Sequence, residues 1–172
     1  KDGDFVEQMF VASTHDHLLF FTNLGRIYRA RVYALPQAGR TSRGKHAANV
    51  LELQRENEKE GTQEETIRTC LVIPRNFQDR SDLKHILMCT ANGICKKIDM
   101  LDPTRVRRTG IRGISLDEGD SLISAALTDG DRELFFTSRN GMGLRVHEST
   151  IRSMGRDARG VIGMRLEPSD QV

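Results

Sequence analysis

Short apolar runs alternate with polar turns along the chain, and one order of residues occurs three times. The three stretches read HLLFFTNLGRIYRARVY from His17, ILMCTANGICKKIDML from Ile86 and LFFTSRNGMGLRVHEST from Leu134. Each contains an apolar run, a Thr or Ser, a turn that ends in glycine, and a second strand-like segment. The turn glycines are Gly25, Gly93 and Gly141. Asn-Gly pairs at the last two turns are typical of type I′ turns, so we predict three β-hairpins.

The second half of each unit also repeats. A glycine preceded by at least one arginine is followed six residues later by an apolar residue. The glycines are Gly44, Gly110 and Gly160, the arginines Arg43, Arg108 and Arg159, and the apolar residues Val50, Leu116 and Leu166. Acidic turns follow the last two of these segments, and the first of them leads into a further short apolar strand. The stretch RTSRGK at residues 40–45 is therefore one of three related segments rather than an isolated basic patch.

A repeat of about 48 residues with four short strands predicts a propeller blade. The turn glycines are 68 and then 48 residues apart, and polar loops at 54–66 and 75–82 account for the longer first unit. We predict an all-β, propeller-like fold of about three blades of four short antiparallel strands, with approximate boundaries at 13–70, 71–127 and 128–172. Residues 1–12 then form the closing strand of a preceding blade. Helical periodicity is weak everywhere except at 146–156.

Positive charge is concentrated in three segments, although the formal net charge is only +2. Residues 17–51, 93–116 and 141–166 hold 17 of the 26 Lys and Arg but only 4 of the 24 Asp and Glu. Regularly spaced cations suit the phosphates of a nucleic acid, because arginine offers two parallel donors to phosphate oxygens. The scarcity of aromatic residues beside these cations argues against a single-strand binder that stacks bases.

Sixteen cations are the candidate DNA-binding residues, because each lies after a turn glycine or around a second-half glycine. They are Arg26, Arg29, Arg31, Arg40, Arg43, Lys45, Lys96, Lys97, Arg105, Arg107, Arg108, Arg112, Arg145, Arg152, Arg156 and Arg159. The glycines of the second halves, with Gly113, either let backbone N–H groups approach a phosphate or allow strands to cross closely. The alternative for the charge runs is an ordinary solvated surface.

Catalytic and metal-binding patterns are weak. His15 and His17 lack a second cluster of metal ligands, and the chain has no phosphate-binding P-loop, nucleophile elbow or acid–base pair. Cys70, Cys89 and Cys95 lack the spacing of a zinc site and are interpreted as reduced, buried thiols. Tyr28 and Tyr33 are interpreted as packing residues. Neither a membrane-spanning run nor a secretion signal is visible, which predicts a cytoplasmic protein. Nucleoid association is expected only from the family resemblance described below.

The repeated segments resemble the carboxy-terminal domain of the DNA gyrase A subunit. The resemblance covers nearly the whole chain. It rests on three stretches: FVASTHDHLLFFTNLGRIYRARVYALPQAGRTSRGKHAANVLEL, which begins at Phe10, TANGICKKIDML and RVHESTIRSMGRDARGVIGMRLEPSD. A similar domain occurs in topoisomerase IV. The resemblance implies a β-pinwheel, a disc whose blades exchange strands, of which this chain holds about half. The Gln-Arg-Arg-Gly-Gly-Lys-Gly box of the family is absent, and RTSRGKH is a degenerate relative of it.

The resemblance also implies a function. The domain is expected to be non-catalytic, to need no cofactor, and to bind and wrap duplex DNA without sequence specificity. In the parent enzyme, an ATP-dependent type II topoisomerase, ATP and Mg²⁺ serve other parts, and the domain supports negative supercoiling. The expected partners are double-stranded DNA, the gyrase B subunit and the amino-terminal breakage-reunion domain of the same subunit, with no membrane contact. Two alternatives remain open: a protein-interaction propeller that binds an acidic partner, and an enzyme that uses His15 or His17.

Overall fold

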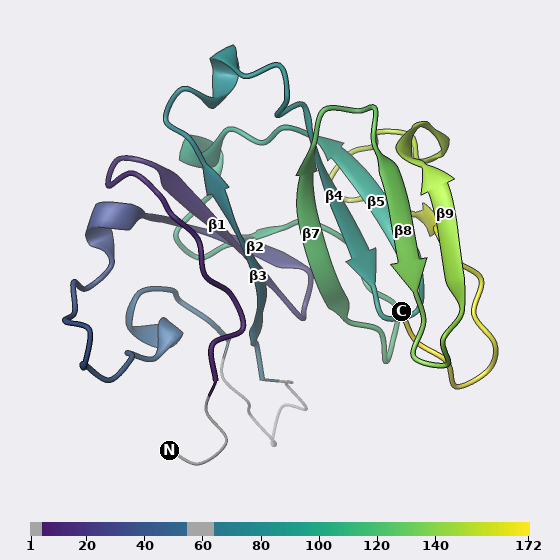
Figure 1. Ribbon diagram of the computed structural model, residues 1–172, viewed down its shortest axis with the longest axis horizontal. Coiled ribbons are helices and arrows are strands. Elements are labelled where there is room, and N and C mark those ends of the chain that lie inside the picture. Colours follow the sequence, from purple (N-terminus) through teal and green to yellow (C-terminus); the bar gives the residue numbers. More distant parts are fainter. Residues whose placement is uncertain (1–4, 55–63) are drawn as a thin grey trace.

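The computed structural model describes residues 5–54 and 64–172 of the chain. In these ranges the secondary structure comprises β-strands and short 3-10 turns, with no α-helix, which confirms the all-β prediction (Figure 1). The strands are β1 (His17–Thr22), β2 (Arg26–Arg31), β3 (Ile67–Ile73), β4 (His85–Thr90), β5 (Ile94–Asp99), β6 (Ile111–Arg112), β7 (Leu122–Thr128), β8 (Glu133–Thr137), β9 (Gly143–His147) and β10 (Val161–Ile162). No helix in the described ranges is long and apolar enough to cross a membrane.

The three predicted hairpins are confirmed as the antiparallel pairs β1–β2, β4–β5 and β8–β9. In each turn the glycine amide donates to the carbonyl of the Thr or Ser three residues earlier, at 2.9 to 3.0 Å. The hydroxyl of that Thr or Ser accepts a second backbone N–H from the residue that follows the glycine. The repeated Thr or Ser therefore closes the turn, which explains its place in the sequence pattern.

The type I′ prediction for these turns is wrong. Gly93 and Gly141 have φ values of +78° and +85°, whereas Ser169 is the one non-glycine residue with positive φ in the described part of the chain. Asn92 and Asn140 therefore keep negative φ. A type I turn followed by one glycine in the left-handed region is the usual form of a three-residue hairpin loop, and it needs only that single positive φ.

Two four-stranded sheets are completed by strands from the following unit. The first sheet has the order β3-β1-β2-β6 and the second sheet the order β10-β5-β4-β7, while β8 and β9 form a two-stranded third sheet. β6 follows the second hairpin in sequence but pairs with β2, and β10 follows the third hairpin but pairs with β5. The fold is thus built of four-stranded antiparallel units that exchange strands, in agreement with the expected β-pinwheel.

The turn glycines mark the places where the exchanged segments cross. The carbonyl of Gly25 accepts N–H groups from Gly113 and Ile114, and the carbonyl of Gly93 accepts N–H groups from Gly163 and Met164. A Cβ at Gly93 would lie 2.3 Å from the Met164 carbonyl oxygen, so no side chain fits there. Close backbone crossing therefore explains these glycines.

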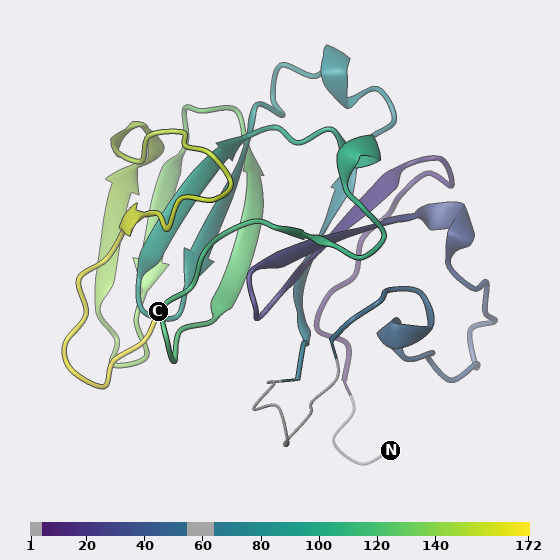
Figure 2. The ribbon, with the colours of Figure 1, turned by 180° about the vertical axis from the view of Figure 1, so that it is seen from behind.

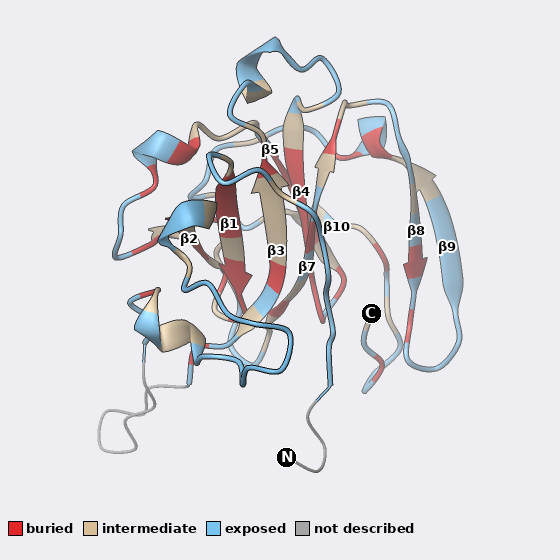
Figure 3. Cartoon of the chain, turned by 60° about the vertical axis from the view of Figure 1, so that its left-hand side comes forward, coloured by how far each residue is buried: buried red, intermediate tan, exposed pale blue. Residues whose placement is uncertain are grey.

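The main core lies between the first and second sheets. Its buried members from the first sheet include Leu19, Phe21, Ile27 and Ile73, and those from the second sheet include Ile86, Met88, Ile98 and Leu122. A second cluster packs the second sheet against the third around Leu87, Cys89, Cys95 and Phe136. Figure 3 shows buried residues along β1, β4 and β7, whereas β9 is largely exposed. The apolar strand faces thus pack against those of a neighbouring unit.

Several segments differ from the predicted strands or loops. Residues 5–12 are not a strand, although the Gln8 side chain hydrogen bonds to Thr69 and Cys70 of β3. Residues 1–4 and most of the polar loop at 54–66 lie outside the described residues. The loop at 75–82 is mainly exposed. Residues 146–156 contain the end of β9 and the 3-10 turn η6 (Glu148–Thr150), with no α-helix. The blade boundaries at 13–70, 71–127 and 128–172 stay a prediction.

Candidate nucleic-acid interface

The sheets have an inner and an outer edge, which decides where an exposed rim lies. β3 and β7, the edge strands of the first and second sheets, pack against each other near the middle of the molecule (Figure 1). The exchanged strands β6 and β10 form the opposite edges of the same sheets. The connections that lead into β6 and β10 are visible from behind in Figure 2. Cations near these outer strands are therefore placed on the rim.

Four predicted cations share one open groove at the rim of the first sheet, which we call the first groove. It has a volume of about 860 Å³ and is lined by Arg29 and Arg31 of β2, Lys45 of the long connection after β2, and Arg108 of the connection into β6. Tyr33 and Asn49 also line it, and no acidic residue does among those that the structure describes. The four cations come from three separate chain segments, so the fold rather than the local sequence gathers them.

A second groove of about 800 Å³ lies at the corresponding place on the second sheet, where β5 ends and the connection into β10 passes. Arg105 and Arg156 line it together with Asp99 and Asp102. Hydrogen bonds from the Thr104 side chain and backbone hold the pKa of Asp102 below its usual value, so this carboxylate stays charged. Two cations and two acids thus nearly balance, and the second groove is a weaker anion site than the first.

The other predicted arginines are spread along the surface, and several are paired with acids. Arg26 and Arg112 are cross-strand partners on β2 and β6, but Arg26 lies 3.8 Å from buried Glu65. Ion pairs also join Arg108 to Glu52, Arg145 to Glu133 and Arg159 to Asp117. Arg40, Arg43, Arg107 and Arg152 are exposed and make no ion pair with any described residue. Exposed pairs of this kind contribute little and can open for a phosphate.

Lys96 and Lys97 do not reach the surface, which corrects their assignment as DNA-binding residues. The Lys96 side chain is fully buried, and its ammonium donates to the carbonyls of Gly113 and Arg156. Burial lowers the pKa of Lys96 to about 8. Lys97 donates to the backbone carbonyl of Glu148 and pairs with its buried carboxylate. Both lysines therefore connect β5, through hydrogen bonds, to segments that come later in the chain.

Packing rather than phosphate binding explains most of the second-half glycines. A Cβ at Gly110 would lie 2.8 Å from the Tyr28 ring, and one at Gly113 would lie 2.8 Å from Ile27. A Cβ at Gly160 would lie 2.6 Å from the Cys95 carbonyl oxygen. Gly44 has open space around it, so the phosphate interpretation keeps a structural basis only there.

The tyrosines and histidines separate into buried and exposed members. Tyr28 is buried and donates to Glu65, as expected for a packing residue, and burial together with this hydrogen bond raises the pKa of Tyr28 well above its usual value. Tyr33, by contrast, is exposed in the first groove against the ring of His15, so its assignment to packing is wrong. His17 is buried. No group of three metal-binding side chains occurs among the residues that the structure describes.

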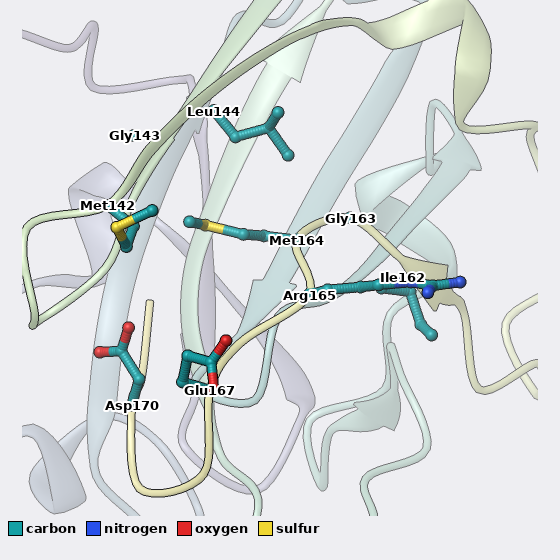
Figure 4. Close-up of a pocket in the computed structure, with 9 residues that line it drawn as sticks. All are labelled: Met142, Gly143, Leu144, Ile162, Gly163, Met164, Arg165, Glu167 and Asp170. Atoms are coloured by element: carbon teal, nitrogen blue, oxygen red, sulfur yellow. The ribbon is translucent and has the colours of Figure 1, made fainter.

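A third groove, of about 550 Å³, lies between β9 and the segment after β10. In Figure 4 the Met164 side chain extends toward Met142, whereas Arg165 points in the opposite direction. Met142 and Ile162 are largely exposed. Glu167 and Asp170 also line this groove, and Arg165 is the one cation among its described lining residues, so it combines apolar sides with two carboxylates and offers no cluster of cations to a phosphate.

Comparison with known proteins agrees with the strand exchange and with the three repeated segments. A family model described as "DNA gyrase C-terminal domain, beta-propeller" matches residues 16–53, 84–129 and 132–172. The chain belongs to this family. The DNA gyrase A subunit of Haloquadratum walsbyi is 40% identical over 172 residues, and that of Mycolicibacterium smegmatis is 39% identical over 174. Both alignments cover the whole chain but 19% of the relative, so the chain spans about a fifth of their length.

Solved structures of this family share the fold. The C-terminal domain of DNA topoisomerase IV is 32% identical and superposes with a TM-score of 0.75, covering 92% of this chain and 46% of that one. The DNA gyrase A C-terminal domain gives a TM-score of 0.68 over 93% of this chain and 47% of that one, at 22% identity, and this likeness concerns the fold alone. This gyrase-family chain thus corresponds to about half of either solved domain.

Proposed function

We propose that this gyrase-family chain binds duplex DNA without sequence specificity and bends it along the rim formed by the outer strands. The first groove carries the proposal, because four cations from three segments line it and, within residues 5–54 and 64–172, no acid does. Phosphates bind such a site through charge and through the planar donors of arginine, with no requirement for base contacts.

The rim geometry supports bending more than straight binding. The second groove stands at the corresponding place one unit further along, so a duplex that follows the rim meets cations at successive units. Bending a duplex by 40 to 90° over 20 to 30 base pairs costs on the order of 1 to 6 kcal/mol. Several phosphate contacts must offset this cost, and the arginines spread between the grooves are available to supply them.

The role in the parent protein is part of the same proposal. The chain acts as a non-catalytic module of a type II topoisomerase and needs no cofactor of its own, while ATP and Mg²⁺ serve other parts. It presents the wrapped DNA to the breakage-reunion domain of the same subunit, within a complex that includes the gyrase B subunit. Membership of the gyrase family supports this assignment.

Fluorescence anisotropy with a random-sequence duplex over a series of salt concentrations tests the proposal. Neutralisation of about six phosphates gives a slope of about −5 in a plot of log K against log salt concentration. The double variant Arg29→Gln with Lys45→Gln removes two cations of the first groove, and neither has an ion pair with a described residue. We expect weaker binding and a slope smaller in magnitude by about 2.

A matched control removes the same charge elsewhere. Arg68 is exposed on the inner strand β3, and Arg139 is exposed in the turn between β8 and β9. The double variant Arg68→Gln with Arg139→Gln is expected to keep the slope of the unmodified chain. Equal losses in the two double variants would show that only net charge matters and would refute the groove. Competition by polyglutamate as strong as by duplex, at equal charge, would favour an acidic protein partner instead.

Bending of the duplex is tested separately by fluorescence energy transfer. A duplex labelled at both ends with a fluorescence energy-transfer pair should show higher transfer efficiency when the chain binds. Unchanged transfer at saturation would leave DNA binding intact but would refute bending.

A further inference from the structure

Two of the three cysteines face each other across the second hairpin. Cys89 in β4 and Cys95 in β5 are partners in the antiparallel register, and both belong to the cluster between the second and third sheets. All three cysteines are free thiols. Cys70 lies apart from them on β3 of the first sheet, where its register partner is Phe20.

The turn geometry places this pair at a position suited to a disulfide. The Gly93 amide donates to the Thr90 carbonyl, and the Ile94 amide uses the Thr90 hydroxyl instead. Thr90 therefore lies in the hydrogen-bonded position next to the turn. Because hydrogen-bonded and non-hydrogen-bonded pairs alternate along antiparallel strands, Cys89 and Cys95 form the next, non-hydrogen-bonded pair. The Cα atoms of such pairs are about 4.5 Å apart, which lies within the range of about 4.4 to 6.8 Å found for disulfides.

The surroundings bring the two thiols into contact and make them unequal. Cys89 and Cys95 are cross-strand partners, and the interaction between their thiols lowers the pKa of Cys89, whereas the same interaction together with burial raises the pKa of Cys95. Cys95 is fully buried, whereas Cys89 keeps 8% of its surface exposed. Gly163 leaves the space for the Cys95 thiol, because a Cβ there would lie 2.4 Å from its Sγ. Cys89 is therefore the thiol that reacts first.

We propose that Cys89 and Cys95 form a reversible redox dithiol that closes to a cross-strand disulfide by exchange with a small disulfide such as oxidised glutathione. The Cys89 thiolate attacks one sulfur of glutathione disulfide, forming a mixed disulfide and releasing one reduced glutathione. Cys95 gives up its proton to solvent and attacks the Cys89 sulfur, which releases the second glutathione. The two protein thiols are oxidised and one glutathione disulfide is reduced to two thiols. The reaction needs no DNA and does not depend on the proposed function.

Cys70 provides an internal reference for this chemistry. It has no thiol neighbour in the register of β1 and β3, and burial raises its pKa to about 12. A low thiolate fraction makes it a slow nucleophile. Oxidation is therefore expected to consume two of the three thiols and to leave Cys70 free.

The experiment treats the intact chain with graded ratios of oxidised to reduced glutathione in the absence of oxygen. The reaction is quenched with acid, remaining thiols are alkylated, and peptides are mapped by mass spectrometry. We expect a peptide cross-linked through Cys89 and Cys95, loss of two of the three alkylatable thiols, and full recovery with dithiothreitol. Persistence of all three thiols at the most oxidising ratio would overturn the proposal, as would a disulfide that includes Cys70 or one that forms only in urea.

Two single variants test the order of the steps. Cys95→Ser should stop at a glutathione adduct on Cys89, because the resolving thiol is absent. Cys89→Ser should form no adduct on Cys95 within the same time. An adduct on Cys95 in the Cys89→Ser chain would contradict the assigned order. If either variant does not fold, the peptide map of the unmodified chain, with Cys70→Ser as its folded control, still decides whether the disulfide forms.

Discussion

Replacing Gly93 by Ala, with Gly141→Ala as its control, tests whether strand exchange stabilises the fold. Both glycines end equivalent hairpin turns, with φ of +78° and +85°. At Gly93 a Cβ would lie 2.3 Å from the Met164 carbonyl oxygen, whereas at Gly141 it would meet nothing within 4 Å. The two variants therefore share the cost of the backbone conformation and differ only in the crossing segment.

The structure sets the expected magnitudes. An alanine in the left-handed region costs about 1 to 2 kcal/mol, of which about 0.4 to 1 kcal/mol is offset by the reduced entropy of the unfolded chain. Gly93→Ala must also displace the segment that donates N–H groups from Gly163 and Met164 to the Gly93 carbonyl, at 2.8 and 3.2 Å. Each lost hydrogen bond costs about 0.5 to 1.5 kcal/mol. We expect Gly93→Ala to destabilise the chain by about 1 to 3 kcal/mol more than Gly141→Ala.

Urea unfolding followed by circular dichroism measures both free energies, provided that the slope with urea is the same for the two variants. Hydrogen exchange adds a local readout, because the amides of Gly163 and Met164 should lose protection only in the Gly93 variant. Equal destabilisation by the two substitutions, or unchanged protection of these amides, would refute the role given to the crossing segment.

Two further predictions concern buried ionisable groups. Glu148→Ala leaves the Lys97 ammonium without its carboxylate and should lower the free energy of unfolding in urea by about 3 to 5 kcal/mol. Adding Lys97→Met should restore part of the lost stability. Strict additivity of the two substitutions in a double-mutant cycle would contradict the pairing. Burial and then the charges of Arg31 and Arg29 lower the pKa of His17 below its ordinary value of 6.5. The folded chain then binds this proton less readily than the unfolded chain, so stability should fall as the pH drops below about 6.5, by at most about 1.4 kcal/mol per pH unit. His17→Gln should flatten this dependence, and an unchanged dependence in the variant would argue against it.

The sequence predicted the hairpins but not every detail of how they join. Apolar runs flanking a Thr or Ser and a glycine turn were enough to place β1–β2, β4–β5 and β8–β9, because hairpins are local. The turn type was wrong because Asn-Gly also fits a three-residue loop with one positive φ. β6 and β10 have only two residues each, which is too short for a periodic pattern, so their exchange was expected only from the family resemblance.

The sequence predicted where the cations lie along the chain but not which of them are buried. Lys96 and Lys97 were grouped with the exposed cations, yet β5 is an interior strand of the second sheet with both faces covered. Alignment of the three hairpins contained a signal, because Lys96 occupies the same place after the turn glycine as Tyr28 and Leu144. Large apolar or aromatic residues at that place in the other units predict an inward position, which the buried Tyr28 follows and the exposed Leu144 does not. Gathering of the first groove from three segments, by contrast, depends on the tertiary fold and has no local signature.

Because the outer strands β6 and β10 come from the following unit, they also limit where the chain can be divided. A cut in the connection at residues 129–132, which looks like a natural boundary between repeats, would remove β10 and leave the outer edge of β5 open. The crossing segment over Gly93 and the acceptor carbonyl of Arg156 for Lys96 would be lost with it. The first and second units therefore each depend on the following unit for their outer strand, and neither can be separated from it at the sequence boundary without exposing a strand edge that invites association between molecules.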